Sequence, residues 1–205
     1  MLDKNGFDLW ADGYEKTVDM SDEENTYPFA GYREVLGRIF QIIMQKPNAK
    51  VLDVGFGTGT LSTKLHERGC SISGQDLSSR MIELARAKMP DADLYQGDFR
   101  HGLVEPLRNQ TYDFIVATYS LHHLTDEQKV ILMHSFYNCL NENGKILIGD
   151  IAFESREKMD LCRREAGDEW DDEECYFVAD ELKNEFPGLA FIQVSHCAGI
   201  LMLAR

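Results

Sequence analysis

Three alternating glycines are the strongest sign of chemistry in this sequence. Gly55, Gly57 and Gly59 follow the largely apolar residues 51–54, so a buried strand is expected to end in a turn with few side chains. A ligand can approach such a turn closely, because no Cβ atom stands between it and the backbone. The pattern therefore indicates a binding site for a nucleotide-like cofactor.

The spacing of the glycines separates the possible cofactors. A dinucleotide fingerprint needs Gly-x-Gly-x-x-Gly, and Thr60 stands where its third glycine would be. A phosphate-binding loop needs Gly-Lys-Ser/Thr, but Leu61 and Ser62 continue the chain without a lysine. With Asp53 two residues before Gly55, the run instead resembles motif I of class I S-adenosylmethionine (SAM) dependent methyltransferases.

Asp76 follows the second predicted strand, 21 residues after Gly55. Open α/β sheets bind ligands at the carboxyl ends of their strands, and a carboxylate there can accept both hydroxyl hydrogens of a ribose. The alternative is that Asp76 only caps the next helix, a role for which Ser78 and Ser79 are also suited. We favour ribose binding, because the spacing of Asp76 from Gly55 agrees with the assignment of the glycine turn as motif I.

The ends of the third and fourth predicted strands carry two further motifs of the same family. In Gly97-Asp98-Phe99, the resemblance implies that Asp98 accepts a hydrogen bond from the adenine amine. Phe99 would flank the adenine ring, although it is equally suited to the core, and Leu77 would cover the other side of the base. Residues 118–124 resemble motif IV, which runs beside the methionine part of SAM.

Two adjacent histidines, His122 and His123, lie in this last run. One is expected to line the acceptor pocket, with His123 slightly favoured, and the other to pack or face solvent. No metal site is expected, because neighbours in sequence point in different directions and no acidic residue falls at a ligand spacing. If the acceptor must lose a proton, His123, His122 and Tyr14 are the candidate catalytic residues.

The N-terminal segment is rich in aromatic residues. The resemblance implies that Trp10 and Tyr14 fold over the cofactor, with Tyr14 near the SAM carboxylate; the alternative is a helix packed on the sheet edge. Asp53 is expected to receive backbone donors of the turn or to approach the SAM amino group. The predicted cofactor contacts are Trp10, Tyr14, Asp53, Gly55, Phe56, Gly57, Thr58, Gly59, Asp76, Leu77, Ser78, Gly97, Asp98, Phe99, Thr118 and Tyr119.

The elements that must position these residues alternate between short β-branched runs and longer helical ones, as in βαβ units. Strands are predicted at residues 50–54, 71–75, 93–96, 113–118, 145–150, 191–195 and 200–204. Helices are predicted at residues 27–45, 60–68 and 79–89, and from the Thr125 capping box to Asn143-Gly144. The link between the last two strands, which includes Cys197-Ala198-Gly199, is too short for a crossover, so those two should form an antiparallel hairpin.

The fold class predicted is therefore α/β: a Rossmann-like three-layer sandwich with a mostly parallel seven-stranded sheet that ends in an antiparallel hairpin. One domain is expected over residues 1–205. Within it, 1–48 would form an N-terminal helical lid, 49–150 the SAM-binding core, 151–189 an acidic lid or insert, and 190–205 the hairpin.

Composition and charge exclude several classes of partner. The net charge is −14, and most of the acidic excess lies in residues 151–185 and 1–48, so the chain should repel nucleic acids. The five cysteines form no Cys-x-x-Cys pair, which indicates reduced thiols rather than a disulfide framework or zinc site. We find no leader pattern and no apolar run near the roughly 20 residues that span a bilayer, and expect a cytoplasmic protein with no membrane partner.

The sequence as a whole predicts methyl transfer from SAM, with S-adenosylhomocysteine as product, to a small-molecule acceptor. Residues 168–174 hold six acidic side chains in seven positions, which form either a solvated face or a substrate gate. A negative rim would favour a neutral or cationic acceptor. The alternatives are a non-catalytic SAM-binding regulatory protein and a nucleotide-cofactor oxidoreductase. A monomer and a homodimer are both compatible with the sequence.

Overall fold

The computed structural model describes Glu23 and residues 25–205, so the predicted lid residues Trp10 and Tyr14 lie outside the described residues. The strands are β1 (Lys50–Val54), β2 (Ser71–Asp76), β3 (Asp93–Gln96), β4 (Tyr112–Thr118), β5 (Leu140–Phe153), β6 (Phe177–Val178), β7 (Ala190–Gln193) and β8 (Ala198–Ala204). The α-helices are α3 (Tyr32–Ile43), α4 (Thr60–Glu67), α5 (Ser79–Lys88), α6 (Glu105–Arg108), α7 (Asp126–Asn138), α8 (Arg156–Ala166) and α9 (Ala179–Leu182). Three short 3-10 turns are η1 (Phe99–His101), η2 (Leu121–His123) and η3 (Gly167–Glu169).

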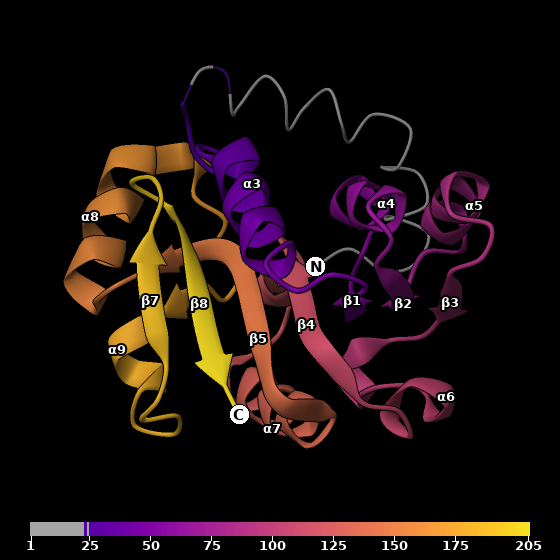
Figure 1. The fold of residues 1–205 in the computed structure, drawn as a ribbon. Coiled ribbons are helices and arrows are strands. Elements are labelled where there is room, and N and C mark those ends of the chain that lie inside the picture. Colours follow the sequence, from indigo (N-terminus) through magenta and orange to yellow (C-terminus); the bar gives the residue numbers. More distant parts are fainter. Residues whose placement is uncertain (1–22, 24) are drawn as a thin grey trace.

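The strands form one sheet in the order β3-β2-β1-β4-β5-β8-β7. The first five of these run parallel, whereas β8 runs antiparallel to both β5 and β7, which closes one edge with the predicted hairpin (Figure 1). The predicted mostly parallel sheet is thus confirmed. The strand β6 was not predicted from the sequence. It has two residues, lies within the segment expected to be an acidic lid, and pairs with the end of β5.

Alternation along the strands divides the core into two layers, one on each side of the sheet. In β1, Val51 joins one apolar cluster, whereas Leu52 and Val54 join the other, because successive side chains of a strand point to opposite faces. The first cluster is covered by α3, α4 and α5, and the second by α6, α7 and α9 (Figure 1). The three-layer arrangement follows from burial of the central strands on both faces.

Helix α7 begins as the sequence predicts and ends earlier. The capping box at Thr125 is present: its hydroxyl accepts from the Gln128 backbone at 3.3 Å, and the Gln128 side chain accepts from the Thr125 backbone at 3.0 Å. The prediction that Asn143-Gly144 closes this helix is wrong, because the helix ends at Asn138. Asn143 and Gly144 instead lie in β5, at an irregularity in its pairing with β4, where a Cβ on Gly144 would come within 2.9 Å of a carbonyl oxygen.

Helix α3 is shorter than the predicted helix over residues 27–45. Residues 27–31 form a turn, and Gly31 has a φ of 81°, a left-handed conformation that the interior of a helix does not allow. Proline at position 28 is also poorly suited to continue a helix. The turn carries Tyr27 and Phe29 over the carboxyl edge of the sheet rather than along the helix.

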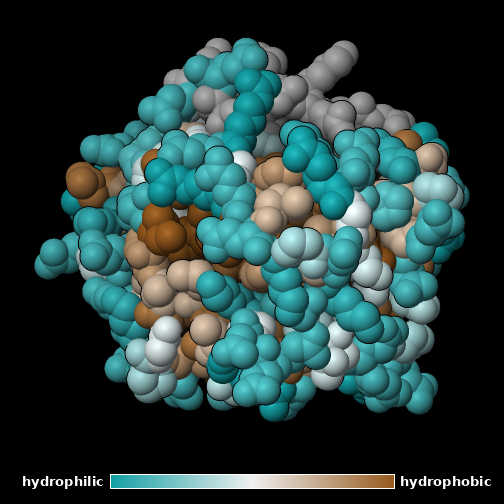
Figure 2. All heavy atoms as spheres, viewed as in Figure 1, coloured by the Kyte–Doolittle hydropathy of each residue, from teal (hydrophilic) through white to brown (hydrophobic). Residues whose placement is uncertain are grey.

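The face of the molecule that carries α3 is mainly hydrophilic, with an apolar hollow over β7 and β8 (Figure 2). No helix among the described residues is both long enough and apolar enough to cross a membrane.

Candidate active site

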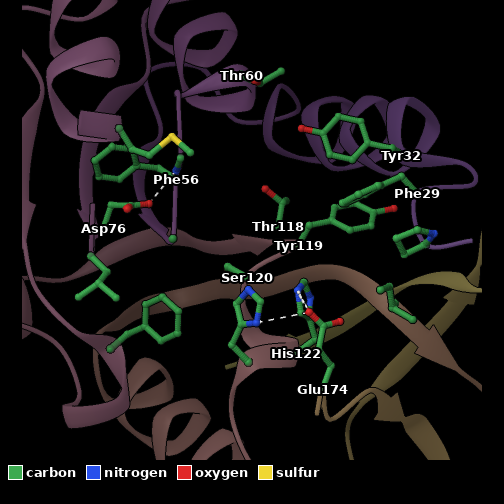
Figure 3. A pocket seen from close by; sticks show the side chains of 18 of the residues that line it. Phe29, Tyr32, Phe56, Thr60, Asp76, Thr118, Tyr119, Ser120, His122 and Glu174 are labelled. Atoms are coloured by element: carbon green, nitrogen blue, oxygen red, sulfur yellow. Dashed lines mark hydrogen bonds and ion pairs between the residues drawn. The ribbon is translucent and has the colours of Figure 1, made fainter. Parts of the chain in front are cut away.

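A cavity of about 420 Å³ lies at the carboxyl ends of β1, β2 and β4. The predicted site residues that line it are Gly55, Phe56, Gly57, Thr58, Asp76, Leu77, Asp98, Phe99, Thr118, Tyr119, His122 and His123. Phe56 and Asp76 lie at one end of the cavity, and His122 lies with Glu174 at the other (Figure 3). We call these the glycine-turn end and the histidine end.

The glycine turn has the backbone that only glycine adopts without strain. Gly55, Gly57 and Gly59 have φ values of 75°, 56° and 79°, all in the left-handed region. A Cβ on Gly55 would lie 2.4 Å from the Cβ of Ser120, so the turn packs directly against the end of β4. A Cβ on Gly57 would meet no atom within 4 Å among the described residues, which leaves this side of the turn open to a ligand.

Asp76 is 8 % exposed and lines the cavity beside the glycine turn. One carboxylate oxygen accepts the backbone N–H of Gly57 at 2.8 Å, and the other accepts that of Ser78 at 2.9 Å. The cap of α5 is the Ser78 side chain, which accepts from the Met81 backbone at 3.1 Å. Asp76 therefore organises the turn and faces the cavity, while the helix cap belongs to another residue.

Asp53, predicted to receive backbone donors of the glycine turn or to approach the SAM amino group, is not among the residues that line the cavity. It is 1 % exposed beneath the glycine turn, and its Oδ2 accepts the Ser62 hydroxyl of α4 at 2.5 Å. Burial, and secondarily the charge of Asp76, raise the pKa of Asp53 to about 7, although the Ser62 hydrogen bond opposes this. The sequence pattern correctly marks the strand end, but the alternation of β1 directs this side chain toward α4.

Three other predicted cofactor residues also lie behind the cavity wall. Gly59 is the N-cap residue of α4, and Ser78 caps α5. Gly97 is packed tightly, since a Cβ there would lie 2.6 Å from a Val104 methyl group. Each of these residues is adjacent in sequence to a residue that does line the cavity.

Asp98 and Phe99 face the cavity after β3, as expected. The Asp98 carboxylate accepts from the backbone of Arg100 at 2.9 Å and forms an ion pair with the Arg100 guanidinium, at 2.7 Å. The Arg100 hydrogen bonds hold the pKa of Asp98 below its ordinary value. Asp98 therefore remains an ionised acceptor at neutral pH.

At the histidine end, His122 is buried between two carboxylates. Its Nδ1 lies 2.6 Å from the wholly buried Asp150 of β5, and its Nε2 lies 3.6 Å from Glu174. Glu174 belongs to the acidic run of residues 168–174, which we call the acidic segment. Burial lowers the pKa of His122, but the charges of Asp150 and Glu174 outweigh it, so the pKa is raised overall. Asp150 also accepts the backbone N–H of Leu121 at 3.1 Å, which fixes the turn that carries His122.

His123 differs in its electrostatics although its ring packs against that of His122, with centroids 4.2 Å apart. Burial, followed by the charge of His122, lowers the pKa of His123 to about 3, so its imidazole is neutral at physiological pH. Its Nδ1 lies 3.6 Å from the same Glu174 oxygen that faces His122. The structure therefore brings both histidines to the cavity, where the sequence prediction placed one.

An aromatic wall, formed by Tyr27, Phe29, Tyr32 and Tyr119, lines the histidine end. The ring of Tyr119 packs against those of Phe29 and Tyr32, with centroid distances of 5.6 and 4.9 Å, and those two rings lie 6.1 Å from each other. The φ of 49° at Tyr119 turns it out of the line of β4. Tyr27 stacks on Trp170 of the acidic segment at 5.4 Å.

Sequence reasoning missed Tyr27, Phe29 and Tyr32, which lie before and within α3, and it missed Asp150. It named Glu174 only as part of the acidic run 168–174. The cluster of Tyr27, Phe29 and Tyr32 around a proline and a glycine was the available signal for the wall, but it was assigned to a helix.

The acidic run 168–174 divides between the two roles that the sequence left open. Glu169, Asp171 and Glu174 line the cavity, whereas Asp172 and Glu173 are exposed on the outer side. Three of the six acidic side chains therefore contribute charge to the cavity, and the others form a solvated face.

The sheet order, the glycine turn and the cavity at the strand ends together define a class I SAM-dependent methyltransferase. Residues 51–144 match the family model described as a methyltransferase domain. The chain is 34% identical over 180 residues to an uncharacterized methyltransferase of Alkaliphilus oremlandii, covering 88% of this chain and 80% of the relative. A second uncharacterized methyltransferase, from Anoxybacillus flavithermus, is 36% identical over 160 residues, with 78% and 72% covered. The chain belongs to this methyltransferase family.

Solved structures share the fold. A DhpI complex with S-adenosylhomocysteine has a TM-score of 0.70 at 14% identity, covering 97% of this chain and 92% of the other. Magnesium protoporphyrin IX methyltransferase from Synechocystis PCC 6803, with bound S-adenosylhomocysteine, has a TM-score of 0.68 at 16% identity, with 86% and 84% covered. Membership of the family sets aside the nucleotide-cofactor oxidoreductase that was an alternative from the sequence. The cofactor of this methyltransferase is SAM.

Proposed function

We propose that this protein transfers the methyl group of SAM to a small-molecule acceptor that is neutral or cationic. The observation that carries the proposal is the continuity of one cavity, which runs from the glycine turn and Asp76 to the aromatic wall and the acidic segment (Figure 3). Donor and acceptor would thus lie end to end in one enclosed space. Methyl transfer from a sulfonium needs mainly such alignment and the exclusion of water.

At the glycine-turn end, the open face of Gly57 would lie against the methionine part of SAM. Asp76 would accept the ribose hydroxyls, since its carboxylate already faces the cavity and is held in place by two backbone donors. Asp98 would accept from the adenine amine, with Phe99 and Leu77 beside the base, because all three line the cavity.

At the histidine end, the charge favours acceptors that are not anionic. Glu169, Asp171 and Glu174 place three carboxylates around an aromatic wall. Aromatic faces attract cations, and a negative rim concentrates them and repels anions. A neutral ring or an amine fits this environment better than a phosphorylated metabolite.

The acceptor needs a base only if it carries a proton at the reacting atom. Of the two histidines, His122 is the better base, because Asp150 orients its ring and raises its proton affinity. His123, with its pKa lowered to about 3, would contribute packing and a neutral nitrogen instead.

The proposal can be tested by calorimetric titration with SAM and S-adenosylhomocysteine, followed by a screen of labelled methyl transfer to matched cationic, neutral and anionic small molecules. We expect SAM binding and turnover only with the first two classes. Glu169→Gln should raise KM for cationic acceptors and leave that for neutral ones unchanged, while Asp168→Asn, a change just outside the cavity wall, should alter neither. Turnover confined to polyanionic acceptors would refute the acceptor class, and absence of SAM binding would refute the donor.

A further inference from the structure

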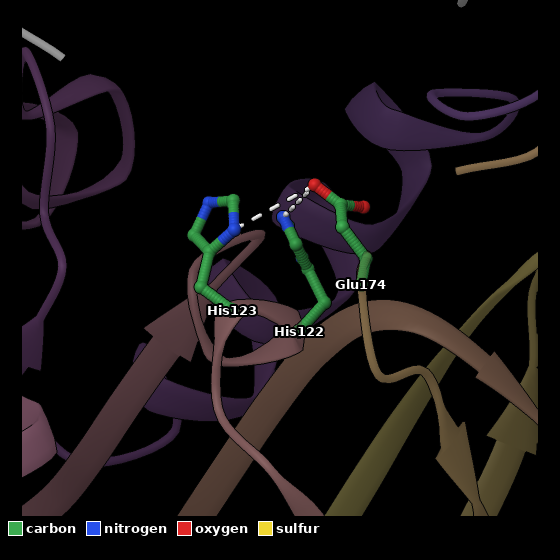
Figure 4. A group of neighbouring side chains, drawn as sticks. All are labelled: His122, His123 and Glu174. Atoms are coloured by element: carbon green, nitrogen blue, oxygen red, sulfur yellow. Dashed lines mark ion pairs between the residues drawn. The ribbon is translucent and has the colours of Figure 1, made fainter. Parts of the chain in front are cut away.

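We propose that His122, His123 and Glu174 form a binding site for one divalent first-row transition-metal cation, such as Zn²⁺, at the histidine end of the cavity. The three side chains point toward one another from two separate segments (Figure 4). The Nε2 of His122 and the Nδ1 of His123 each lie 3.6 Å from the same Glu174 oxygen, and all three ligand atoms lie within 4.8 Å of one another. Ligands of a tetrahedral zinc ion, bound at about 2.0 to 2.2 Å, are themselves separated by about 3.3 to 3.6 Å. Only a small inward movement would complete the geometry.

The backbone already holds the two ligand segments together. The N–H of Cys175 donates to the carbonyl oxygen of His122 at 2.9 Å, so the residue after one ligand is bonded to the main chain of another. Because this hydrogen bond exists before a cation binds, binding does not require the two ligand segments to become ordered. A site that is assembled beforehand binds more tightly than one that must be organised.

Two of the three ligands also have the outer partners that metal ligands commonly use. The Nδ1 of His122 is bound by Asp150, which leaves Nε2 directed at the site, and a metal-bound histidine typically donates its second N–H to a carboxylate. The Oε2 of Glu174 accepts the Tyr176 hydroxyl at 3.0 Å, which leaves Oε1 directed at the two histidines. These contacts fix which atom of each side chain would bind the cation.

The local charge also favours a dication. Asp150 is fully buried and the Glu174 side chain is 21 % exposed, so two carboxylates share a weakly solvated region. The buried Lys129 lies near them, but its ammonium is paired with Asp126 at 3.0 Å. Charges removed from water need compensation, and one divalent cation would balance both carboxylates. The expectation of no metal site considered only residues close in sequence to the histidines, whereas the structure supplies the carboxylate from the acidic segment.

Three protein ligands would leave at least one coordination position open toward the cavity, as in catalytic rather than structural zinc sites. This part of the inference rests on the proposed function: an oxygen, nitrogen or sulfur atom of the acceptor would occupy that position, and the cation would lower the pKa of its proton. The cation would then take the place of a free His122 base. Two nitrogen ligands and one carboxylate suit zinc, iron(II), cobalt(II) and nickel(II) better than magnesium or calcium.

The experiment uses full-length, untagged protein that has been stripped with a chelator. Co²⁺ is titrated while its visible absorption bands are followed, and Zn²⁺ is then added as a competitor. We expect one cation per chain, affinity lost in Glu174→Gln and in His123→Asn, and a drop of about 10 to 100-fold in Asp150→Asn through the outer partner. Asp172→Asn, from the same acidic run, and His196→Asn, from an exposed turn, should bind as the wild type does.

Failure of this inference is distinguishable from failure of the proposed function, because the titration needs neither SAM nor an acceptor. Absence of saturable binding, or equal affinity in Glu174→Gln and His123→Asn, would overturn the metal site. Methyl transfer that depends on His122 but survives in stripped protein would overturn the role of the cation in the reaction and leave His122 as a base. A wild-type protein that does not bind SAM would contradict only the proposed function, not the metal site.

Discussion

The carboxylate of Asp76 accepts the backbone N–H of Gly57 at 2.8 Å, so the end of β2 holds the glycine turn that follows β1. The carboxylate and the turn thus form one unit at the glycine-turn end of the cavity. Asp76 therefore maintains the shape of the backbone that a ligand would contact at the turn. The same residue is expected to bind the ribose.

Asp76→Ala should therefore weaken SAM binding. We expect a loss of about 1 to 3 kcal/mol, because the ribose hydroxyls and the Gly57 and Ser78 amides lose an acceptor together. Asp76→Asn keeps one oxygen and should lose less. Isothermal titration with S-adenosylhomocysteine measures both variants, and an affinity equal to that of the wild type in Asp76→Ala would show that the ribose lies elsewhere.

Gly55→Ala should destabilise the fold more than Gly57→Ala. Both substitutions incur the strain of a left-handed alanine, about 1 to 2 kcal/mol, but only Gly55→Ala also drives a Cβ against Ser120. We expect a further loss of about 1 to 3 kcal/mol for Gly55→Ala. Urea unfolding without ligand gives the comparison. Equal losses in the two variants would mean that β4 does not pack against the turn as described.

The raised pKa of Asp53 predicts a pH dependence of stability. In the folded state this pKa is raised from its ordinary value of 3.8 to about 7. The contribution of Asp53 to the stability of the folded state is therefore fully present below about pH 4 and is lost as pH rises toward 7. In Asp53→Asn the side chain cannot ionise, so the variant should gain up to about 4 kcal/mol relative to the wild type between pH 5 and pH 8.

Denaturant unfolding at several pH values measures this difference. Ser62→Ala is the matched comparison, because removing the hydroxyl that lowers the pKa of Asp53 should extend the loss of stability to higher pH. Parallel pH profiles for the wild type and Asp53→Asn would contradict the prediction.

The stack of Trp170 on Tyr27 should stabilise the acidic segment against the turn before α3. The rings are 5.4 Å apart with an interplanar angle of 17°, and Trp170 also meets the edge of Tyr176 at 4.8 Å. Trp170→Ala should cost about 1 to 3 kcal/mol of unfolding free energy, and Trp170→Phe less, since it keeps an aromatic face. Limited proteolysis should cut the acidic segment faster in the alanine variant. Unchanged stability and cleavage would show that the stack does not hold the segment.

Much of the fold could be predicted because its signals are local. The run before Gly55 reads as a buried strand, Thr125 and Gln128 cap a helix through neighbours three residues apart, and the short link before β8 requires a hairpin. The errors also have local causes. Asn143-Gly144 is typical of a helix end but lies in an irregular strand. Gly31, in a left-handed conformation, ends the turn that precedes α3, so this helix begins later than the sequence predicts.

The sequence by itself determined the α/β fold and the glycine-turn end of the cavity, because strand alternation and left-handed glycines are properties of short stretches of chain. Only the tertiary structure decided the histidine end. It joins His122 of η2, Asp150 of β5 and Glu174 of the acidic segment, and turns Asp53 away toward α4. No periodicity encodes such a meeting, since it depends on how the sheet and the segments over its edge pack in space.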